Sequence, residues 1–158
     1  MSGTARRLAA EFTGTALLVA IVVGSGIAVT RLTSDGALRL LVNSLVTAAG
    51  LAVLIIVLAP AGGAQLNPVV TAADWITARR YRLRVAAAVM SAQAAGAIAG
   101  AALADAMFGI TVLRASGHHR GGGPLLLSEA VATAGLLFVI VALVRTGRIQ
   151  HVAWAVGA

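Results

Sequence analysis

Gly62-Gly63-Ala64-Gln65-Leu66-Asn67-Pro68-Val69-Val70-Thr71 is the segment that most constrains the fold of this chain. Asn is a favoured helix N-cap, and Pro loses nothing at the first helical position because the N–H it lacks would be unpaired there anyway. Asn67-Pro68 therefore predicts a helix start. Since this start follows a long apolar run, the positive end of the helix dipole and its free N–H groups face membrane-depth sequence. Such an arrangement is costly unless it lines a cavity or a pore.

The composition is that of an integral membrane protein. Hydrophobic residues make up 59% of the 158 residues and charged residues 11%, and the mean hydropathy is +0.96. Soluble domains are about 45–50% apolar and about 25% charged. The basic residues are all arginine and cluster between apolar segments without interleaved aromatic residues, which argues against nucleic acid as a partner and for the lipid bilayer. Cysteine is absent, so no disulfide or thiol nucleophile is available.

Four apolar stretches are each long enough to cross a bilayer, which takes about 20 residues. They run over residues 8–30, 38–59, 85–113 and 125–144, and a fifth begins near residue 151. The helix predicted over residues 67–80 would reach only about 20 Å, so it is predicted to be a half-helix that enters and leaves on one side. We treat residues 1–158 as a single membrane domain.

The arginines predict the orientation of this topology. The side of the N-terminus would hold Arg6, Arg7, Arg79, Arg80, Arg82, Arg84, Arg145 and Arg148. The opposite side would hold Arg31, Arg39, Arg114 and Arg120. Because positive charge concentrates on the cytoplasmic side, we expect a multi-pass protein of the plasma (inner) membrane with a cytoplasmic N-terminus.

Two carboxylates occur in matching positions of the first and fourth spans. Glu11 and Glu129 each have a threonine four residues later, Thr15 and Thr133, on the same helical face. With opposite span directions, the match indicates an inverted repeat, and each carboxylate is expected to be buried and to accept N–H bonds from a non-helical loop. The alternative is that each is a charge at a helix N-terminus near the headgroups, favoured by the dipole.

The third span combines small residues with one polar group. Ala92, Gly96, Gly100 and Ala104 recur at four-residue spacing, which permits close helix packing in lipid. Gln93 lies deep in the span and is expected to bond a neighbouring polar group.

Motifs for catalysis or metal binding are absent from the sequence. It contains no nucleophile elbow and no His-Glu-x-x-His pattern, so we expect no enzymatic activity and no cofactor. His118 and His119 have no further ligand at metal-binding spacing, so a solvated loop pair is expected in place of a metal site.

The assembled residues resemble the aquaporin family (major intrinsic proteins) along the whole chain. The resemblance rests on four ordered motifs: Ala10-Glu11-Phe12 with Gly14-Thr15, the stretch over residues 62–71, Ala92-Gln93-Ala94-Ala95-Gly96, and the Glu129/Thr133 pair. It implies an all-α, inverted-repeat helical bundle in the membrane with one re-entrant half-helix, lacking most of the second repeat.

The resemblance implies a passive channel for water or small neutral solutes, a homotetramer when complete. Asn67 would lie at the pore midpoint and donate to a passing oxygen, while the backbone carbonyls of Gly63, Ala64 and Gln65 would form a ladder of acceptors. Glu11 and Glu129 would brace two re-entrant loops. The positive end of a helix at the pore midpoint repels cations. Hydrogen-bond donors there orient each water molecule so that protons are not passed along a chain of waters.

Three positions depart from the family pattern. Val69 follows Asn67-Pro68 where alanine is usual, adding two methyl groups where half-helices would meet. Gln65 stands where histidine is frequent. Ala49, assigned to the constriction, would leave the opening wide, which favours glycerol-like polyols or undissociated metalloid acids.

The length also departs from the family. The repeat places a second Asn-Pro near residue 185, whereas the sequence has 158 residues. We therefore expect this chain to be an incomplete channel or a fragment. The alternatives are a non-conducting membrane scaffold and an inverted-repeat transporter of another family.

Overall fold

The described part of the molecule, residues 3–78, 81–112 and 121–158 of a computed structural model, is built from helices and contains no strand. The elements are α1 (Gly3–Leu32), α2 (Gly36–Gly62), α3 (Pro68–Ala78), α4 (Leu83–Met107), α5 (Gly123–Arg145), the short 3-10 helix η1 (Ile149–His151) and α6 (Val152–Gly157). The all-α fold class predicted from the sequence is confirmed. Helices α1, α2, α4 and α5 are each long and apolar enough to cross a membrane.

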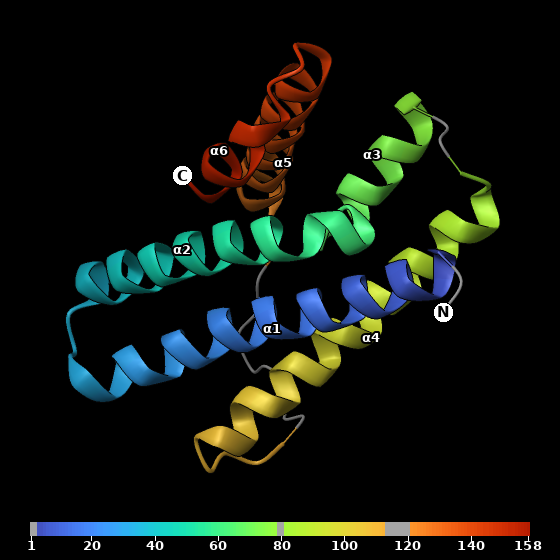
Figure 1. Cartoon of the computed structure of the whole chain (residues 1–158). Helices are drawn as coiled ribbons and strands as arrows, with labels where there is room; N and C mark the ends of the chain where they lie inside the picture. The colour runs from blue at the N-terminus through green and yellow to red at the C-terminus, as the bar shows by residue number, and fades with distance from the viewer. Residues whose placement is uncertain (1–2, 79–80, 113–120) are drawn as a thin grey trace.

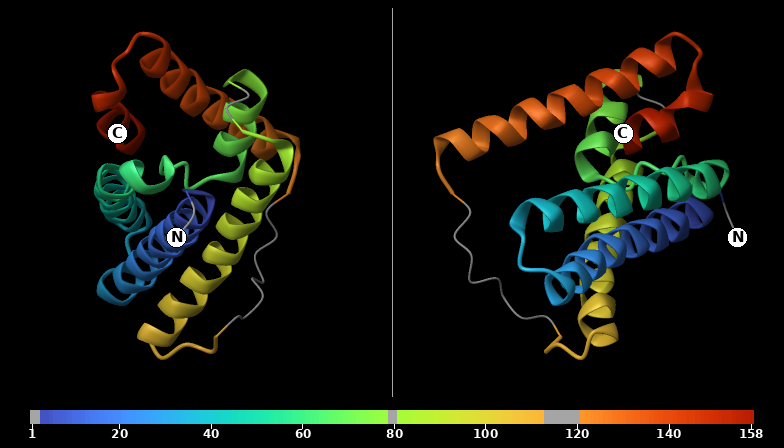
Figure 2. Two further views of the ribbon diagram at one scale, coloured as in Figure 1. Left: turned by 45° about the vertical axis from the view of Figure 1, so that its right-hand side comes forward. Right: turned by 90° about the vertical axis from the view of Figure 1, so that its left-hand side faces the viewer.

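Helices α1 and α2 lie side by side and antiparallel (Figures 1 and 2). The turn between them is closed by polar contacts. The Oδ1 atom of Asp35 accepts the N–H of Leu38 at 2.9 Å and so caps α2, while Arg39 Nε donates to the carbonyl oxygen of Thr33 at 2.7 Å. These contacts satisfy turn groups and permit a tight reversal after residue 32.

Helix α4 crosses α1 at a contact made by glycines (Figure 1). A Cβ atom built on Gly96 would collide with the carbonyl oxygen of Phe12, and one on Gly100 with that of Ala16. Gly96, Gly100 and Ala104 are buried members of the small-residue series in the third span. Because glycine has only a hydrogen atom in place of a side chain, the backbones of α1 and α4 come closer together here than larger residues would allow.

Helix α4 ends before the predicted limit of the third span. The sequence predicted an apolar segment to residue 113, whereas α4 ends at Met107 and residue 113 lies outside the described residues. The Phe108 N–H bonds to Ala104 O at 3.1 Å, and Gly109 follows with φ of 66°, a left-handed conformation that stops a helix. Arg31 Nη2 also donates to Phe108 O at 2.6 Å, which ties this end of α4 to the end of α1.

Helix α3 leaves α2 at an angle and packs against α4 (Figures 1 and 2). It lies where a half-helix was expected over residues 67–80, and the structure describes a helix over Pro68–Ala78. Residues 79 and 80 lie outside the described ranges. Helix α2 ends at Gly62, and the next residue, Gly63, caps it with φ of 92° and donates its N–H to Ala59 O at 2.9 Å. This glycine cap redirects the chain into the segment that precedes α3.

Helix α5 packs mainly against α6 and η1, and α6 in turn packs against α2 (Figure 2). Glu129 is exposed and Thr133 is half-buried, so the expected burial of this pair is wrong for the described structure. The physical reason is local. No described loop lies against this face of α5 and presents N–H groups to the Glu129 carboxylate, which stays on the surface.

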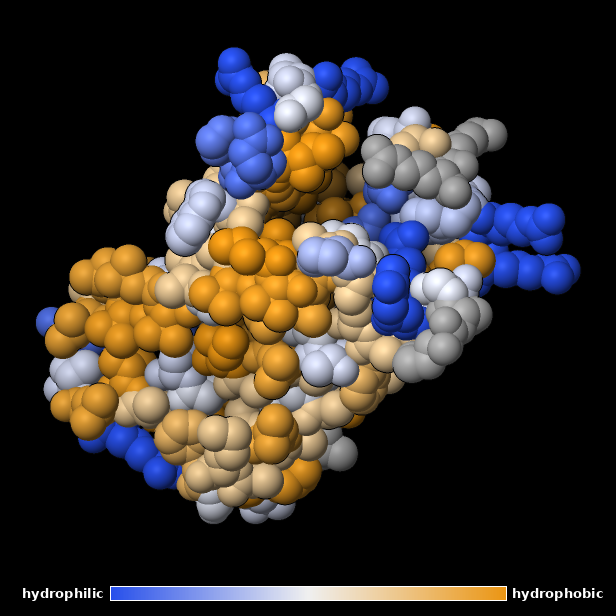
Figure 3. Space-filling view, in the orientation of Figure 1, coloured by the Kyte–Doolittle hydropathy of each residue, from blue (hydrophilic) through white to orange (hydrophobic). Residues whose placement is uncertain are grey.

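Apolar side chains cover much of the outer surface. Figure 3 shows them gathered over the face on which α1 and α2 lie. Large apolar residues of α2 and α5 are among those exposed, such as Leu40, Val57, Leu126 and Phe138. Contiguous exposed apolar surface on this scale is typical of a protein whose surroundings are lipid.

Candidate functional site

The segment between α2 and α3 has an unusual backbone. Ala64 and Leu66 have φ values of 48° and 49°, and Gly63 has φ of 92°. A non-glycine residue in this left-handed region costs about 1–2 kcal/mol, so the surroundings must hold it there. Leu66 and Ala64 are buried in one apolar cluster with Leu54. Packing of these side chains is one of two constraints on the segment.

The second constraint is the carboxylate of Glu11, which is fully buried. Its Oε1 accepts the N–H of Gln65 at 2.9 Å, and its Oε2 accepts the N–H of Leu66 at 2.8 Å. Gln93 Nε2 donates to the same Oε2 at 2.8 Å. A buried carboxylate is tolerated when such donors replace its water, and bonds to an ionised acceptor are stronger than neutral ones. Glu11 thus holds two consecutive N–H groups of the strained segment toward α1.

Gln93 extends this network from α1 to α3. Its Nε2 also donates to Thr71 Oγ1 at 2.9 Å, and both residues are fully buried. The Thr71 hydroxyl has one hydrogen and lies within reach of Gln65 Oε1 at 2.9 Å and of Asn67 O at 3.2 Å. Three helices are therefore linked by buried polar groups, as expected for Gln93.

Asn67 caps α3 through its side-chain oxygen. Oδ1 accepts the N–H of Val69 at 2.8 Å and lies 3.4 Å from the N–H of Val70, with Pro68 at the first helical position. Because the oxygen is engaged by the helix, the amide hydrogens on Nδ2 point away from it. They bond to no acceptor in the described part of the chain. Asn67 is half-buried, and its Nδ2 is an oriented, unoccupied donor.

The carbonyl groups before Asn67 are also unoccupied. Among the residues that the structure describes, none donates to the backbone oxygens of Gly63, Ala64 or Gln65. Glu11 engages the N–H groups of Gln65 and Leu66 and none of these carbonyl oxygens. The segment thus carries a row of acceptors followed by the donor of Asn67.

The side chain of Gln65 turns into a cluster of its own. Its Oε1 accepts from Arg7 Nη2 at 2.9 Å, and its Nε2 donates to Asp74 Oδ2 at 3.0 Å. The Arg7 guanidinium carbon lies 4.2 Å from the centroid of the Tyr81 ring, a cation–π distance. This cluster joins the start of α1 to α3 and to Tyr81, which shortly precedes α4.

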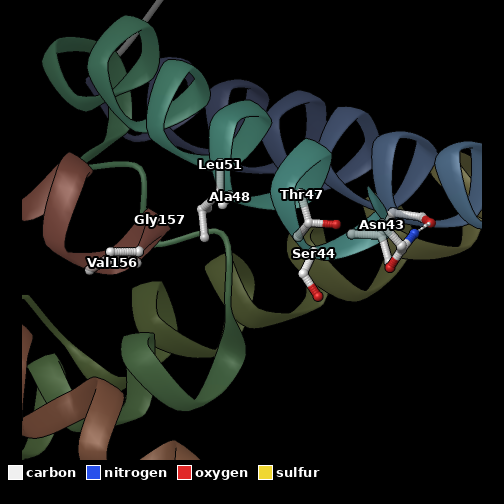
Figure 4. A pocket seen from close by; sticks show the side chains of 9 residues that line it. Asn43, Ser44, Thr47, Ala48, Leu51, Val156 and Gly157 are labelled. Carbon is white, nitrogen blue, oxygen red and sulfur yellow. Dashed lines mark hydrogen bonds between the residues drawn. The ribbon is translucent and has the colours of Figure 1, made fainter. Parts of the chain in front are cut away.

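A hollow of about 340 Å³, with polar and apolar lining residues, lies between α2 and α6 (Figure 4). It is lined by Val22, Asn43, Ser44, Thr47, Ala48, Leu51, Val156, Gly157 and Ala158. Asn43, Ser44 and Thr47 were not among the residues predicted from the sequence. The sequence did contain a signal for these residues. The three polar side chains lie within five positions of an apolar span and share one side of the helix. Polar groups at membrane depth often mark functional positions.

Ala49 lies elsewhere. It is exposed and lines a separate apolar hollow with Val46, Gly50 and Val53. Ala49 and Thr47 are two positions apart, about 200° around the helix, so they lie on different sides of α2 and line different hollows. Thr15, one turn after Glu11, is buried, and its Oγ1 has no hydrogen-bond partner among the described residues.

Comparison with known proteins gives consistent matches. A family model described as "Major intrinsic protein" matches residues 2–157. Aquaglyceroporin AqpS of Rhizobium meliloti (strain 1021) is 47% identical over 152 residues, which cover 96% of this chain and 64% of that protein. Probable aquaporin PIP2-8 of Oryza sativa subsp. japonica is 37% identical over 134 residues, which cover 84% of this chain and 46% of that protein. The chain thus spans less than two thirds of the length of either relative.

Proposed function

The chain belongs to the major intrinsic protein family, and on this basis we propose that it contributes to a passive transmembrane channel for water and small neutral solutes. It is a multi-pass membrane protein, and the described ranges contain four helices of spanning length. The name of the aquaglyceroporin relative supports polyols among the solutes, and undissociated metalloid acids are of similar size and neutrality.

The observation that carries the proposal is the backbone held by Glu11. Two N–H groups of the segment before α3 are fixed on the Glu11 carboxylate, which leaves the carbonyls of residues 63–65 free. A solute that sheds water needs such replacements for its hydrogen bonds. Asn67 follows as a donor at the positive end of α3, which disfavours cations. Val69, half exposed at this helix start, is a further candidate lining residue.

We propose the hollow between α2 and α6 as a second part of the pathway. Thr47 lines it and replaces Ala49 as our candidate for the lining position on α2. The apolar walls, Val22, Leu51 and Val156, suit the carbon skeleton of a polyol. We further propose a cytoplasmic N-terminus, insertion in the plasma (inner) membrane and assembly as a homotetramer.

Swelling of proteoliposomes tests the proposal. The protein is reconstituted into proteoliposomes, which are mixed rapidly with solutions that set up a water, glycerol or urea gradient across the vesicle membrane. Protein-free vesicles are the reference. We expect faster swelling with the protein in at least the water or glycerol gradient. Equal rates with and without protein would end the channel proposal and favour a non-conducting scaffold.

Asn67→Asp tests the role of the Asn67 amide. Asp caps a helix as well as Asn does, so α3 should persist and circular dichroism should be unchanged. The donor is replaced by a negative charge, so we expect loss of neutral-solute flux or a leak of cations in the swelling assay. Unchanged flux and selectivity would show that this side chain does not face the pathway.

A further inference from the structure

The polar side of α2 contains an acceptor whose direction is fixed by α1. We propose that Asn43 and Ser44 form a binding station for a small polyol, an inference that rests on the proposed channel function. Both residues line the hollow between α2 and α6. Figure 4 shows them on the same side of α2, with α6 residues farther along the hollow.

The orientation of the Asn43 amide follows from its partners. Nδ2 donates to the carbonyl oxygen of Val22 at 2.8 Å, and this oxygen can only accept. The second hydrogen of Nδ2 is directed to Ser25 Oγ at 2.9 Å, whose own hydrogen is given to Ile21 O at 2.6 Å. Both amide hydrogens of Asn43 are therefore used inside the α1–α2 contact. The amide cannot turn over without placing its oxygen against another acceptor.

Oδ1 of Asn43 consequently faces away from α1. It accepts no hydrogen bond from the residues that the structure describes and is not among their enclosed unpaired atoms. The adjacent Ser44 is exposed, and its hydroxyl has no partner in the described ranges.

The chemistry of these groups selects the ligand class. Oδ1 only accepts, so the ligand must carry a donor, and the Ser44 hydroxyl can give or take a second bond. The two groups are neutral and few, so they cannot replace the hydration of an ion. Val22, Leu51 and Val156 supply an apolar wall for C–H groups. A small polyol offers hydroxyl groups and a carbon skeleton together, which water does not.

Glycerol binding tests the inference directly. The protein in lipid nanodiscs is titrated with glycerol and followed by saturation-transfer NMR. Asn43→Leu should weaken binding about three- to tenfold, the effect of one net hydrogen bond. Because Asn43→Leu also removes contacts to α1, Ser44→Ala serves as a second variant that breaks no described contact, with an expected loss of about threefold. Val46→Ala, in the separate apolar hollow, is the matched control and should bind as the wild type does.

The outcomes separate this inference from the channel proposal. Absence of glycerol binding by the wild-type protein, or binding unchanged in both Asn43→Leu and Ser44→Ala, overturns the binding station. A comparable loss in Val46→Ala also overturns it, because the effect would then not be local. Swelling is measured on the same preparations. Glycerol binding that depends on Asn43 and Ser44 in a protein that does not speed swelling supports the station and contradicts the channel.

Discussion

Glu11 shows how one side chain can hold a strained backbone. Its carboxylate is fully buried and accepts from two loop N–H groups and from Gln93. The left-handed residues Ala64 and Leu66 persist because these bonds and the packing of Leu66 together exceed the conformational cost. The sequence suggested the role of Glu11 through its position in an apolar span. It could not indicate which two N–H groups would be bound.

Glu11→Gln tests this bracing. An amide has one acceptor oxygen and directs N–H hydrogens at a group that also donates, so one loop N–H loses its partner. Leaving a buried donor unsatisfied costs about 1–3 kcal/mol. We expect a lower midpoint of thermal unfolding, followed by circular dichroism in a fixed detergent.

Glu129→Gln is the matched control, because Glu129 is exposed in the described structure. Its unfolding midpoint should stay within error of the wild type. Equal shifts for Glu11→Gln and Glu129→Gln would show that the loop does not depend on a buried carboxylate.

At the scale of elements, the close crossing of α1 and α4 depends on two glycines, which have no side chain. Gly96 and Gly100 face the backbone oxygens of Phe12 and Ala16, where a methyl group has no space. The four-residue spacing of small residues predicted close packing but not its partner. Spacing is a property of one helix, whereas the partner depends on how several helices assemble.

Gly96→Ala and Gly100→Ala should each destabilise the protein. The neighbour that would have to move is backbone, so we expect a cost of about 1–3 kcal/mol, as for overpacking elsewhere. Gly135→Ala in α5 is the control, since a Cβ there meets nothing within 4 Å. That change should be neutral or stabilising, because alanine favours helix over glycine. Comparable losses at all three positions in thermal unfolding would contradict the close-contact explanation.

The cluster around Gln65 links α1 to α3 and is the second contact between elements that the sequence did not reveal. Arg7 bonds to Gln65 and stacks on Tyr81, although these residues are distant along the chain. Arg7→Ala should loosen α3 because both interactions are lost. Hydrogen exchange should become faster in residues 68–78, and Arg6→Ala should leave it unchanged, because Arg6 is exposed. Equal exchange in the two variants would show that the cluster does not stabilise α3.

For the whole molecule, the absence of cysteine makes the proposed topology accessible to experiment. Thr4→Cys and Ser34→Cys each add one thiol at an exposed position, at opposite ends of α1. If the N-terminus is cytoplasmic, a membrane-impermeant maleimide should label Ser34→Cys in intact cells and Thr4→Cys only after the membrane is opened. The reverse pattern would overturn the orientation that the arginine distribution predicts.

Local sequence was enough to predict the helical class, the membrane setting and the helix start at Asn67-Pro68. These features depend on hydropathy, helix capping and segment length. Each of these is a property of a short stretch of sequence and does not depend on which other segments pack against it. The sequence also brought out Glu11 and Gln93, because polar groups are conspicuous in apolar spans.

Which groups meet was settled by the tertiary structure alone. It directed Glu11 to Gln65 and Leu66, joined Arg7 to Tyr81, left Glu129 on the surface and put Thr47 and Ala49 on different sides of α2. Such pairings depend on the rotation of each helix about its axis and on the partner that each face finds. Adjacent positions differ by about 100° around a helix, so a small error in register moves a residue from one hollow to another.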